Sequence, residues 1–159
     1  MGEKRYFAAY AENISAAGML RRCPDAKYVG TAEIKNQRLV FRGGNGVARA
    51  TLDKKARRKV PAVIWMISEA DEEKLDSCKS FPRICGKQEF NVDVISLIDG
   101  EKIAELGVFT YVCDTMPLGR PSDVHYRCCE DGYRYFGFDP KVLEKARQES
   151  TAAKKPAAE

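Results

Sequence analysis

The sequence predicts an α+β domain with about six or seven strands and several flanking helices. Apolar runs rich in β-branched residues, such as residues 60–67, have the profile of strands covered on both faces. Segments that begin with a serine cap and an acidic first turn, such as residues 68–78, are typical of helices. With 159 residues, 44% of them hydrophobic, the chain is long enough to bury one core. We therefore expect a single domain over residues 1–149 and a disordered tail, poor in apolar anchors, over residues 150–159.

In the first half, apolar or alternating runs predict strands and polar or glycine-rich segments predict connections. Ser15 is expected to cap a short helix over residues 15–23, directly after the first strand. The glycine-rich residues 43–46 suggest a hairpin loop rather than a phosphate loop, because no Gly-Lys-Ser/Thr follows. The basic residues 53–59 are expected to form a solvated connection. The expected strands of this half are residues 5–10, two runs within residues 27–42 separated by a turn at Lys35-Asn36, residues 47–52 and residues 60–67.

In the second half, Ser68 and Asp71 resemble a capping box for a helix that ends near Cys78. Asp99-Gly100 is a hairpin signal between two strands, residues 90–98 and 102–113. Two C-terminal helices complete the prediction. The first is capped by Ser122 and ends near Gly137, and the second starts at Asp139-Pro140 and runs to about Gln148.

Charge and segment composition exclude several classes of protein. The net charge of +4 is small, and no nucleic-acid-binding motif accompanies it, so no nucleic-acid partner is expected. No stretch approaches the length of about 20 apolar residues that a transmembrane helix needs, and no apolar signal region is present at the N-terminus. We expect a cytoplasmic protein without a membrane partner.

The six cysteines do not form a metal-binding or disulfide pattern. They contain no Cys-x-x-Cys pair, and two of them are adjacent, so we expect mostly buried thiols without disulfides. Only one histidine, His125, is present, and therefore no zinc site or other metal site is expected and no cofactor is indicated.

The segment VPAVIWMISEADEEKLDSCKSFP, residues 60–82, resembles the γ-glutamylcyclotransferase family, in particular its small bacterial AIG2-like members. The family pattern is similar to V-P-x-x-V-W-x-I-S-x-x-D-x-x-x-L-D-x-x-E-G-F-P. The family's catalytic glutamate falls on Lys79 here, and Ser80 stands in place of the following glycine. An ammonium group has donors only, so Lys79 in its usual charged form is not a general base.

The resemblance extends to the turn after the first strand. The family carries Y-G-S-N-M in a loop that holds the carboxylate end of the substrate, and this chain has Tyr10-Ala11-Glu12-Asn13-Ile14. Tyr10 and Asn13 fit, whereas Ala11 and Glu12 differ. A Glu12 carboxylate about 4 Å from a ligand carboxylate would cost about 4 kcal/mol at an effective dielectric constant near 20. Alternatively, Glu12 points into solvent.

A third matching segment is PLGRPSDVHYRCCEDGYRYFGFD, residues 117–139, where the family has P-L-G-x-P-S-x-x-Y. His125 occupies the position of that pocket tyrosine, with Tyr126 next to it; the other interpretation of His125 is a packing or surface residue. The resemblance, from Tyr6 to about Glu144, implies a small mixed β-barrel with a cavity at its mouth. The implied ligand-binding residues are Tyr10, Ala11, Glu12, Asn13, Lys79, Ser80, His125 and Tyr126.

These substitutions leave three interpretations open. The favoured one is a pseudoenzyme that binds a small polar ligand, amino-acid-like or a γ-glutamyl compound, without the family reaction. The second is an altered cyclotransferase, acting on a γ-glutamyl amine or amide, in which Glu12 or His125 serves as the base. The third is a closed pocket in a protein-interaction module, with Glu12 and Lys79 paired across it.

Overall fold

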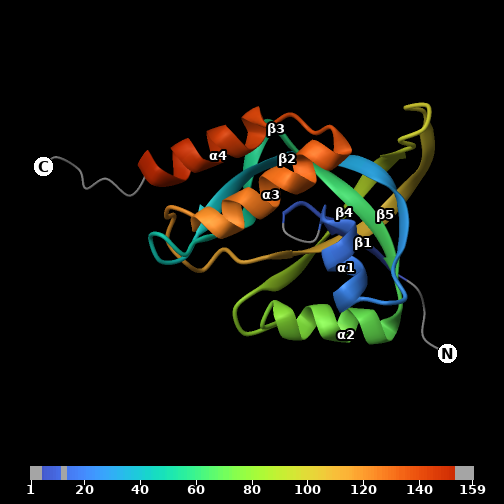
Figure 1. The fold of residues 1–159 in the computed structure, drawn as a ribbon, viewed down its shortest axis with the longest axis horizontal. Helices are drawn as coiled ribbons and strands as arrows, with labels where there is room; N and C mark the ends of the chain where they lie inside the picture. Colours follow the sequence, from blue (N-terminus) through green and yellow to red (C-terminus); the bar gives the residue numbers. More distant parts are fainter. Residues whose placement is uncertain (1–4, 12–13, 153–159) are drawn as a thin grey trace, which may run out of the picture.

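The computed structural model describes residues 5–11 and 14–152, and these form a closed five-stranded β-barrel with four helices around it (Figure 1). The α+β class predicted from the sequence is confirmed. The elements in chain order are β1 (Arg5–Ala9), α1 (Ala16–Arg22), β2 (Lys27–Arg42), β3 (Arg49–Ile67), α2 (Glu69–Cys78), β4 (Gly86–Ile95), β5 (Lys102–Val112), α3 (Asp123–Phe136) and α4 (Lys141–Ala152).

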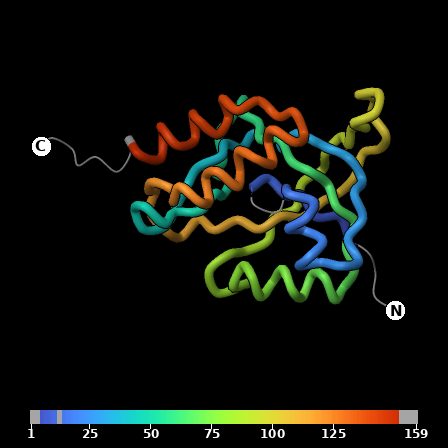
Figure 2. The backbone as a smooth tube through the Cα atoms, viewed as in Figure 1, coloured from blue at the N-terminus to red at the C-terminus, as the bar shows by residue number. Residues whose placement is uncertain are grey.

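The barrel has the strand order β1-β3-β2-β4-β5, and β1 and β5 pair to close it. The β1–β5 pairing is parallel, at Phe7 and Phe109, and all other pairings are antiparallel, so the sheet is mixed. Closure between β2 and β4 depends on Gly30, because a Cβ atom there would lie 2.6 Å from the carbonyl oxygen of Ile95. As the tube in Figure 2 shows, α3 and α4 lie on one side of the barrel and α2 lies on the opposite side.

The structure has five strands rather than six or seven, because β2 and β3 are longer than expected. Lys35-Asn36 is not a turn: Asn36, with φ of 61°, lies within β2 opposite a bulge of β3, and pairing passes from Lys35↔Lys59 to Gln37↔Lys54. Residues 55–58 on β3 are the extra residues at this bulge, and Arg57 also has a positive φ of 69°. The basic run 53–59 is therefore part of β3. Lys54, Lys55, Arg57 and Lys59 are exposed, whereas Asp53 and Arg58 are partly buried. Residues 53, 54 and 59 pair with β2.

The predicted helix caps are confirmed. The Ser15 hydroxyl accepts a hydrogen bond from the backbone N–H of Gly18, and Ser68 and Asp71 form a reciprocal capping box at the start of α2. Ser122 caps α3, and Gly137 ends it with φ of 74°, which favours glycine. No helix among the described residues is long and apolar enough to cross a membrane.

Helix α4 extends further than predicted, to Ala152, and includes Ser150, which the sequence analysis placed in the tail. Ser150 is fully buried, and its hydroxyl accepts the backbone N–H of Phe41 at 2.8 Å. This bond secures α4 against β2. Residues 153–159 lie outside the described part of the chain.

The expectation that the cysteines form no disulfide is wrong for one pair. Cys85 and Cys113 form a disulfide, with Cα atoms 4.2 Å apart. The reason is strand register: Gly86 pairs with Val112, so the residues just outside this pair face each other although 28 residues separate them in sequence. Of the other described cysteines, Cys23 and Cys129 are buried and Cys78 is exposed. Burial, with the nearby Asp71 charge, raises the pKa of the Cys23 thiol to about 12.

Candidate functional site

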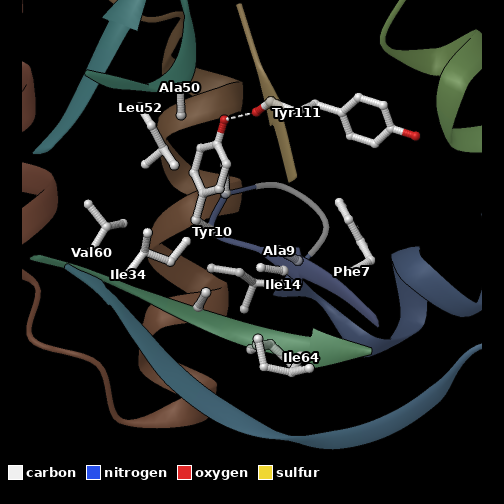
Figure 3. Packing of buried hydrophobic residues seen from close by; sticks show 14 of the residues in the cluster. Phe7, Ala9, Tyr10, Ile14, Ile34, Ala50, Leu52, Val60, Ile64 and Tyr111 are labelled. Atoms are coloured by element: carbon white, nitrogen blue, oxygen red, sulfur yellow. Dashed lines mark hydrogen bonds between the residues drawn. The ribbon is translucent and has the colours of Figure 1, made fainter. Parts of the chain in front are cut away.

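The ends of β1 and β5 are joined by polar contacts at the mouth of the barrel. The hydroxyl of Tyr10, directly after β1, donates to the backbone carbonyl of Tyr111 at 2.6 Å (Figure 3). Beside it, the Thr110 hydroxyl donates to the carbonyl of Ala8, also at 2.6 Å. These bonds fix where the chain leaves β1, and therefore fix the wall formed by Tyr10 and Ala11.

Lys79 reaches this mouth because helix α2 ends there. Its backbone N–H donates to the carbonyl of Leu75 at 2.9 Å, and Ser80 then turns the chain away with a left-handed φ of 52°. The next residue, Phe81, packs edge-on against Tyr111, with ring centroids 6.3 Å apart. The loop after α2 is thereby held against the end of β5, with Lys79 half-buried between them.

Two cavities share Lys79. The first, here called the inner cavity, is lined by residues 7–11, Lys79, Thr110 and Tyr111, and its volume is about 10 Å³. The second, the outer cavity, is lined by the end of α1, the tip of the β2–β3 hairpin, the loop after α2 and the segment after β5, and its volume is about 560 Å³. A single water molecule needs roughly 10–15 Å³. The inner cavity is therefore effectively filled, whereas the outer cavity has room for a small molecule.

The outer cavity is lined by basic side chains. Arg22, Arg42, Arg49 and Lys79 all contribute to its wall, and none of the described lining residues is acidic. Arg42 is held in place because its Nη1 donates to the carbonyl of Met116 at 2.9 Å and its Nη2 lies 3.5 Å from a carboxylate oxygen of Asp53. Around these charges the wall is apolar, with the exposed side chains of Val47, Ile84 and Met116 and with the Cys85–Cys113 disulfide.

The structure brings together some of the predicted site residues. Tyr10 and Ala11 line the inner cavity, Ser80 lines the outer cavity, and Lys79 lines both. Glu12 and Asn13 lie outside the described residues.

His125 is buried in the core, against the start of β3. It is 7% exposed, and its Nε2 accepts the backbone N–H of Ala50 at 3.0 Å. Its ring stands edge-on to Phe41. It does not line the inner or the outer cavity.

Tyr126 also lies away from Lys79. It lines a separate surface cavity of about 500 Å³ between α3 and α4, where the guanidinium of Arg147 lies 4.1 Å from the centre of its ring. Burial raises the pKa of Tyr126, although the Arg147 charge acts in the opposite direction. Neither His125 nor Tyr126 therefore lines the two cavities that Lys79 shares.

The arginines of the outer cavity were not predicted from the sequence. Arg42 and Arg49 pair directly across the two strands at the tip of the β2–β3 hairpin. Their symmetric placement around the glycine-rich turn was the one sequence feature that could have indicated them. No sequence feature indicates Arg22, because only the fold brings the end of α1 to the same wall. Within the described residues, no group of three or more His, Cys, Asp or Glu side chains could hold a metal ion.

The fold resembles solved structures of cyclotransferase and AIG2-like proteins. One is described as a gamma-glutamyl cyclotransferase, with a TM-score of 0.76, 18% sequence identity, and coverage of 99% of this chain and 91% of that protein. An uncharacterized protein from Homo sapiens has a TM-score of 0.72 at 18% identity, with the same coverage. An AIG2-like protein from Mus musculus has a TM-score of 0.57 at 16% identity, covering 71% of this chain and 79% of its own.

At these identities the comparisons establish the fold alone: the chain has the γ-glutamylcyclotransferase-like fold. No protein-family model matches the sequence. No curated protein matches it either.

Proposed function

We propose that this protein binds a small anionic ligand, amino-acid-like or a γ-glutamyl compound, in the outer cavity and does not form 5-oxoproline from it. The observation that carries the proposal is the position of Lys79, which lies in the wall of a filled inner cavity and of an open, basic outer one. In the resemblance to the cyclotransferases, Lys79 takes the place of the catalytic glutamate. The fold likeness to a gamma-glutamyl cyclotransferase supports γ-glutamyl compounds as the first ligands to test.

The charges of the outer cavity favour an acidic ligand. Guanidinium groups present donors that match a carboxylate or phosphate in bidentate geometry, and such charge-assisted hydrogen bonds are the stronger ones. Arg42 needs little reorganisation to bind, because Met116 and Asp53 already orient it. The apolar part of the wall would receive the uncharged part of the ligand.

The described residues of the two cavities supply no base for the cyclisation chemistry. That reaction needs a base within hydrogen-bond reach of the ligand's α-amine. None of the described residues that line the two cavities is Asp, Glu or His. His125 lines neither cavity, and its Nε2 lone pair accepts the backbone N–H of Ala50, a residue of the outer cavity wall. We also propose that the protein is cytoplasmic.

Titration calorimetry with γ-glutamyl amino acids and with their uncharged amide analogues tests the binding. We expect the acidic compounds to bind and the amides to bind at least about tenfold more weakly. Arg49→Gln should weaken binding by about ten- to a hundredfold, since a hydrogen bond to a charged group contributes about 1.5–3 kcal/mol. The matched control is Lys59→Gln, which removes an exposed cation paired with Glu33 outside the cavity and should leave binding unchanged.

A parallel assay of 5-oxoproline release tests the absence of catalysis. We expect no release from the wild type and no gain in Lys79→Glu, because the inner cavity leaves no room for the substrate. Release by the wild type that disappears in Glu12→Gln would instead support an active cyclotransferase with Glu12 as its base. If no compound binds and none is turned over, the protein-interaction interpretation replaces this one.

A further inference from the structure

The Cys85–Cys113 disulfide forms part of the wall of the outer cavity. Cys113 is half-buried and Cys85 is 4% exposed, and both residues line the cavity. A small molecule in the cavity would therefore lie beside the disulfide. Exchange requires access to a sulfur atom, which a disulfide enclosed in a packed core would not offer.

The disulfide lies in the same wall as Arg22, Arg42, Arg49 and Lys79. Thiol–disulfide exchange begins with a thiolate and releases a thiolate, so positive charge near the bond favours both the approach and the departure. The same charges raise the local concentration of anionic reactants. The cavity thus combines an accessible disulfide with an environment that stabilises thiolates.

We infer that Cys85–Cys113 is a thiol-exchange site for small anionic thiols that enter the outer cavity. The thiolate of the small molecule attacks the more accessible Cys113 sulfur, the Cys85–Cys113 bond breaks, and Cys85 leaves as a thiolate. The product is a mixed disulfide between Cys113 and the small thiol. A second molecule of thiol converts this product to two protein thiols and one small-molecule disulfide, so no other oxidant or reductant is needed.

The bond joins two parts of the cavity wall, because Cys85 ends the loop after α2 and Cys113 follows β5. Opening it would release these parts from each other. The inference goes beyond the proposed ligand, because exchange does not require that any non-thiol compound bind.

The experiment measures how fast three thiols of different charge open the disulfide: 3-mercaptopropionate (anionic), 2-mercaptoethanol (neutral) and cysteamine (cationic). Samples of the full chain are quenched in acid, alkylated and mapped by mass spectrometry, so that labels on Cys85 and Cys113 report the opened bond. The same measurement on urea-unfolded protein gives the intrinsic reactivity of each thiol. The native-to-unfolded rate ratio then isolates the effect of the cavity.

We expect this ratio to be at least about fivefold higher for the anionic thiol than for the cationic one. Arg49→Gln should reduce the difference, whereas Lys59→Gln, outside the cavity, should preserve it. Cys78→Ser should leave it unchanged, which excludes the exposed Cys78 thiol of the same wall as the attacking group. Three results would overturn the inference: equal ratios for the three thiols, an opening rate independent of thiol concentration, or six alkylated cysteines in protein never exposed to reductant.

Discussion

His125 joins the first turn of α3 to the start of β3, because its Nε2 accepts the backbone N–H of Ala50 at 3.0 Å. Its own backbone N–H donates to the capping hydroxyl of Ser122 at 3.1 Å. The imidazole therefore satisfies a buried backbone donor that no other described residue is shown to satisfy. The role that the structure gives His125 is structural.

Replacing this acceptor should destabilise the fold. His125→Phe keeps an aromatic ring against Phe41 but leaves the Ala50 N–H unpaired, and an unsatisfied buried donor costs about 1–3 kcal/mol. Urea unfolding followed by circular dichroism measures the change in the free energy of unfolding. The neighbouring Val124, whose side chain is 76% exposed, provides the control: Val124→Ala should change stability by less than about 0.5 kcal/mol. Equal stability of His125→Phe and wild type would contradict the assigned role.

Acid should loosen the packing of α4 through Glu149. Partial burial acts to raise the pKa of this carboxyl, but the hydrogen bonds and charge of Arg58 and the charge of Arg38 outweigh it and hold the pKa below its usual value of 4.5. A lowered folded-state pKa adds stability that is present above the unfolded-state value and is lost as the pH falls through the folded-state value. Glu149→Gln should therefore be less stable than wild type at pH 7. The difference should shrink below about pH 4.5, as urea titrations at pH 7 and pH 3 would show. A difference independent of pH would rule out this linkage.

Lys87 should contribute more to stability than an ordinary surface lysine. Its Nζ lies 2.6 Å from a carboxylate oxygen of Glu72 and 3.0 Å from one of Asp76, and only 18% of the side chain is exposed. It also lies 4.3 Å from the centre of the Phe81 ring. Lys87→Met leaves two partly buried carboxylates facing an apolar group. We expect the free energy of unfolding, measured by urea titration, to fall by about 1–3 kcal/mol.

Lys102 provides the comparison for Lys87. It pairs with Asp93 at 3.2 Å, but both side chains are about half exposed, so solvent screens the pair. Lys102→Met should cost less than about 1 kcal/mol in the same denaturant titration. Equal losses of stability for the two variants would contradict the claim that the burial of Lys87 strengthens its ion pairs.

Replacing Gly132 by alanine should destabilise the protein, although alanine is normally more favourable than glycine in a helix. Glycine to alanine in a helix usually stabilises by about 0.5–1 kcal/mol. At Gly132 in α3, however, a Cβ atom would lie 2.7 Å from Cγ2 and 2.9 Å from Cβ of the buried Ile14. Gly132→Ala should lower the melting temperature, since overpacking a core typically costs about 1–3 kcal/mol. Gly86→Ala, where the new Cβ meets no atom within 4 Å, should not lower it.

The helices could be predicted because their signals are local. The Ser68–Asp71 capping box and the αL glycine at Gly137 lie within a few residues of the element they define. The end of α2 puts Lys79 directly after that helix, whereas its place beside a cavity was implied only by the family resemblance.

The features that were missed depend on contacts between distant residues. Asn36 has the sequence of a turn, yet pairing with β3 on both sides of it keeps β2 continuous. The Cys85–Cys113 disulfide follows from the register of β4 and β5, which the spacing of the cysteines does not reveal. Ser150 is polar and lies in an alanine- and lysine-rich segment. In the fold it is buried, and its hydroxyl accepts a hydrogen bond from the backbone N–H of Phe41 in β2. Arg42 and Arg49 become part of a site only once the hairpin packs against the segment after β5.

The parallel contact of β1 with β5 has a consequence for biosynthesis. The hydrogen bonds from the Thr110 hydroxyl to the Ala8 carbonyl and from the Tyr10 hydroxyl to the Tyr111 carbonyl join residues 102 and 101 positions apart. During translation β1 emerges before its partner β3, which pairs with it across 54 to 62 residues of sequence, but the contact with β5 cannot form until β5 has left the ribosome. Until then the nascent chain holds an open sheet whose β1 edge is unpaired and available to other strands.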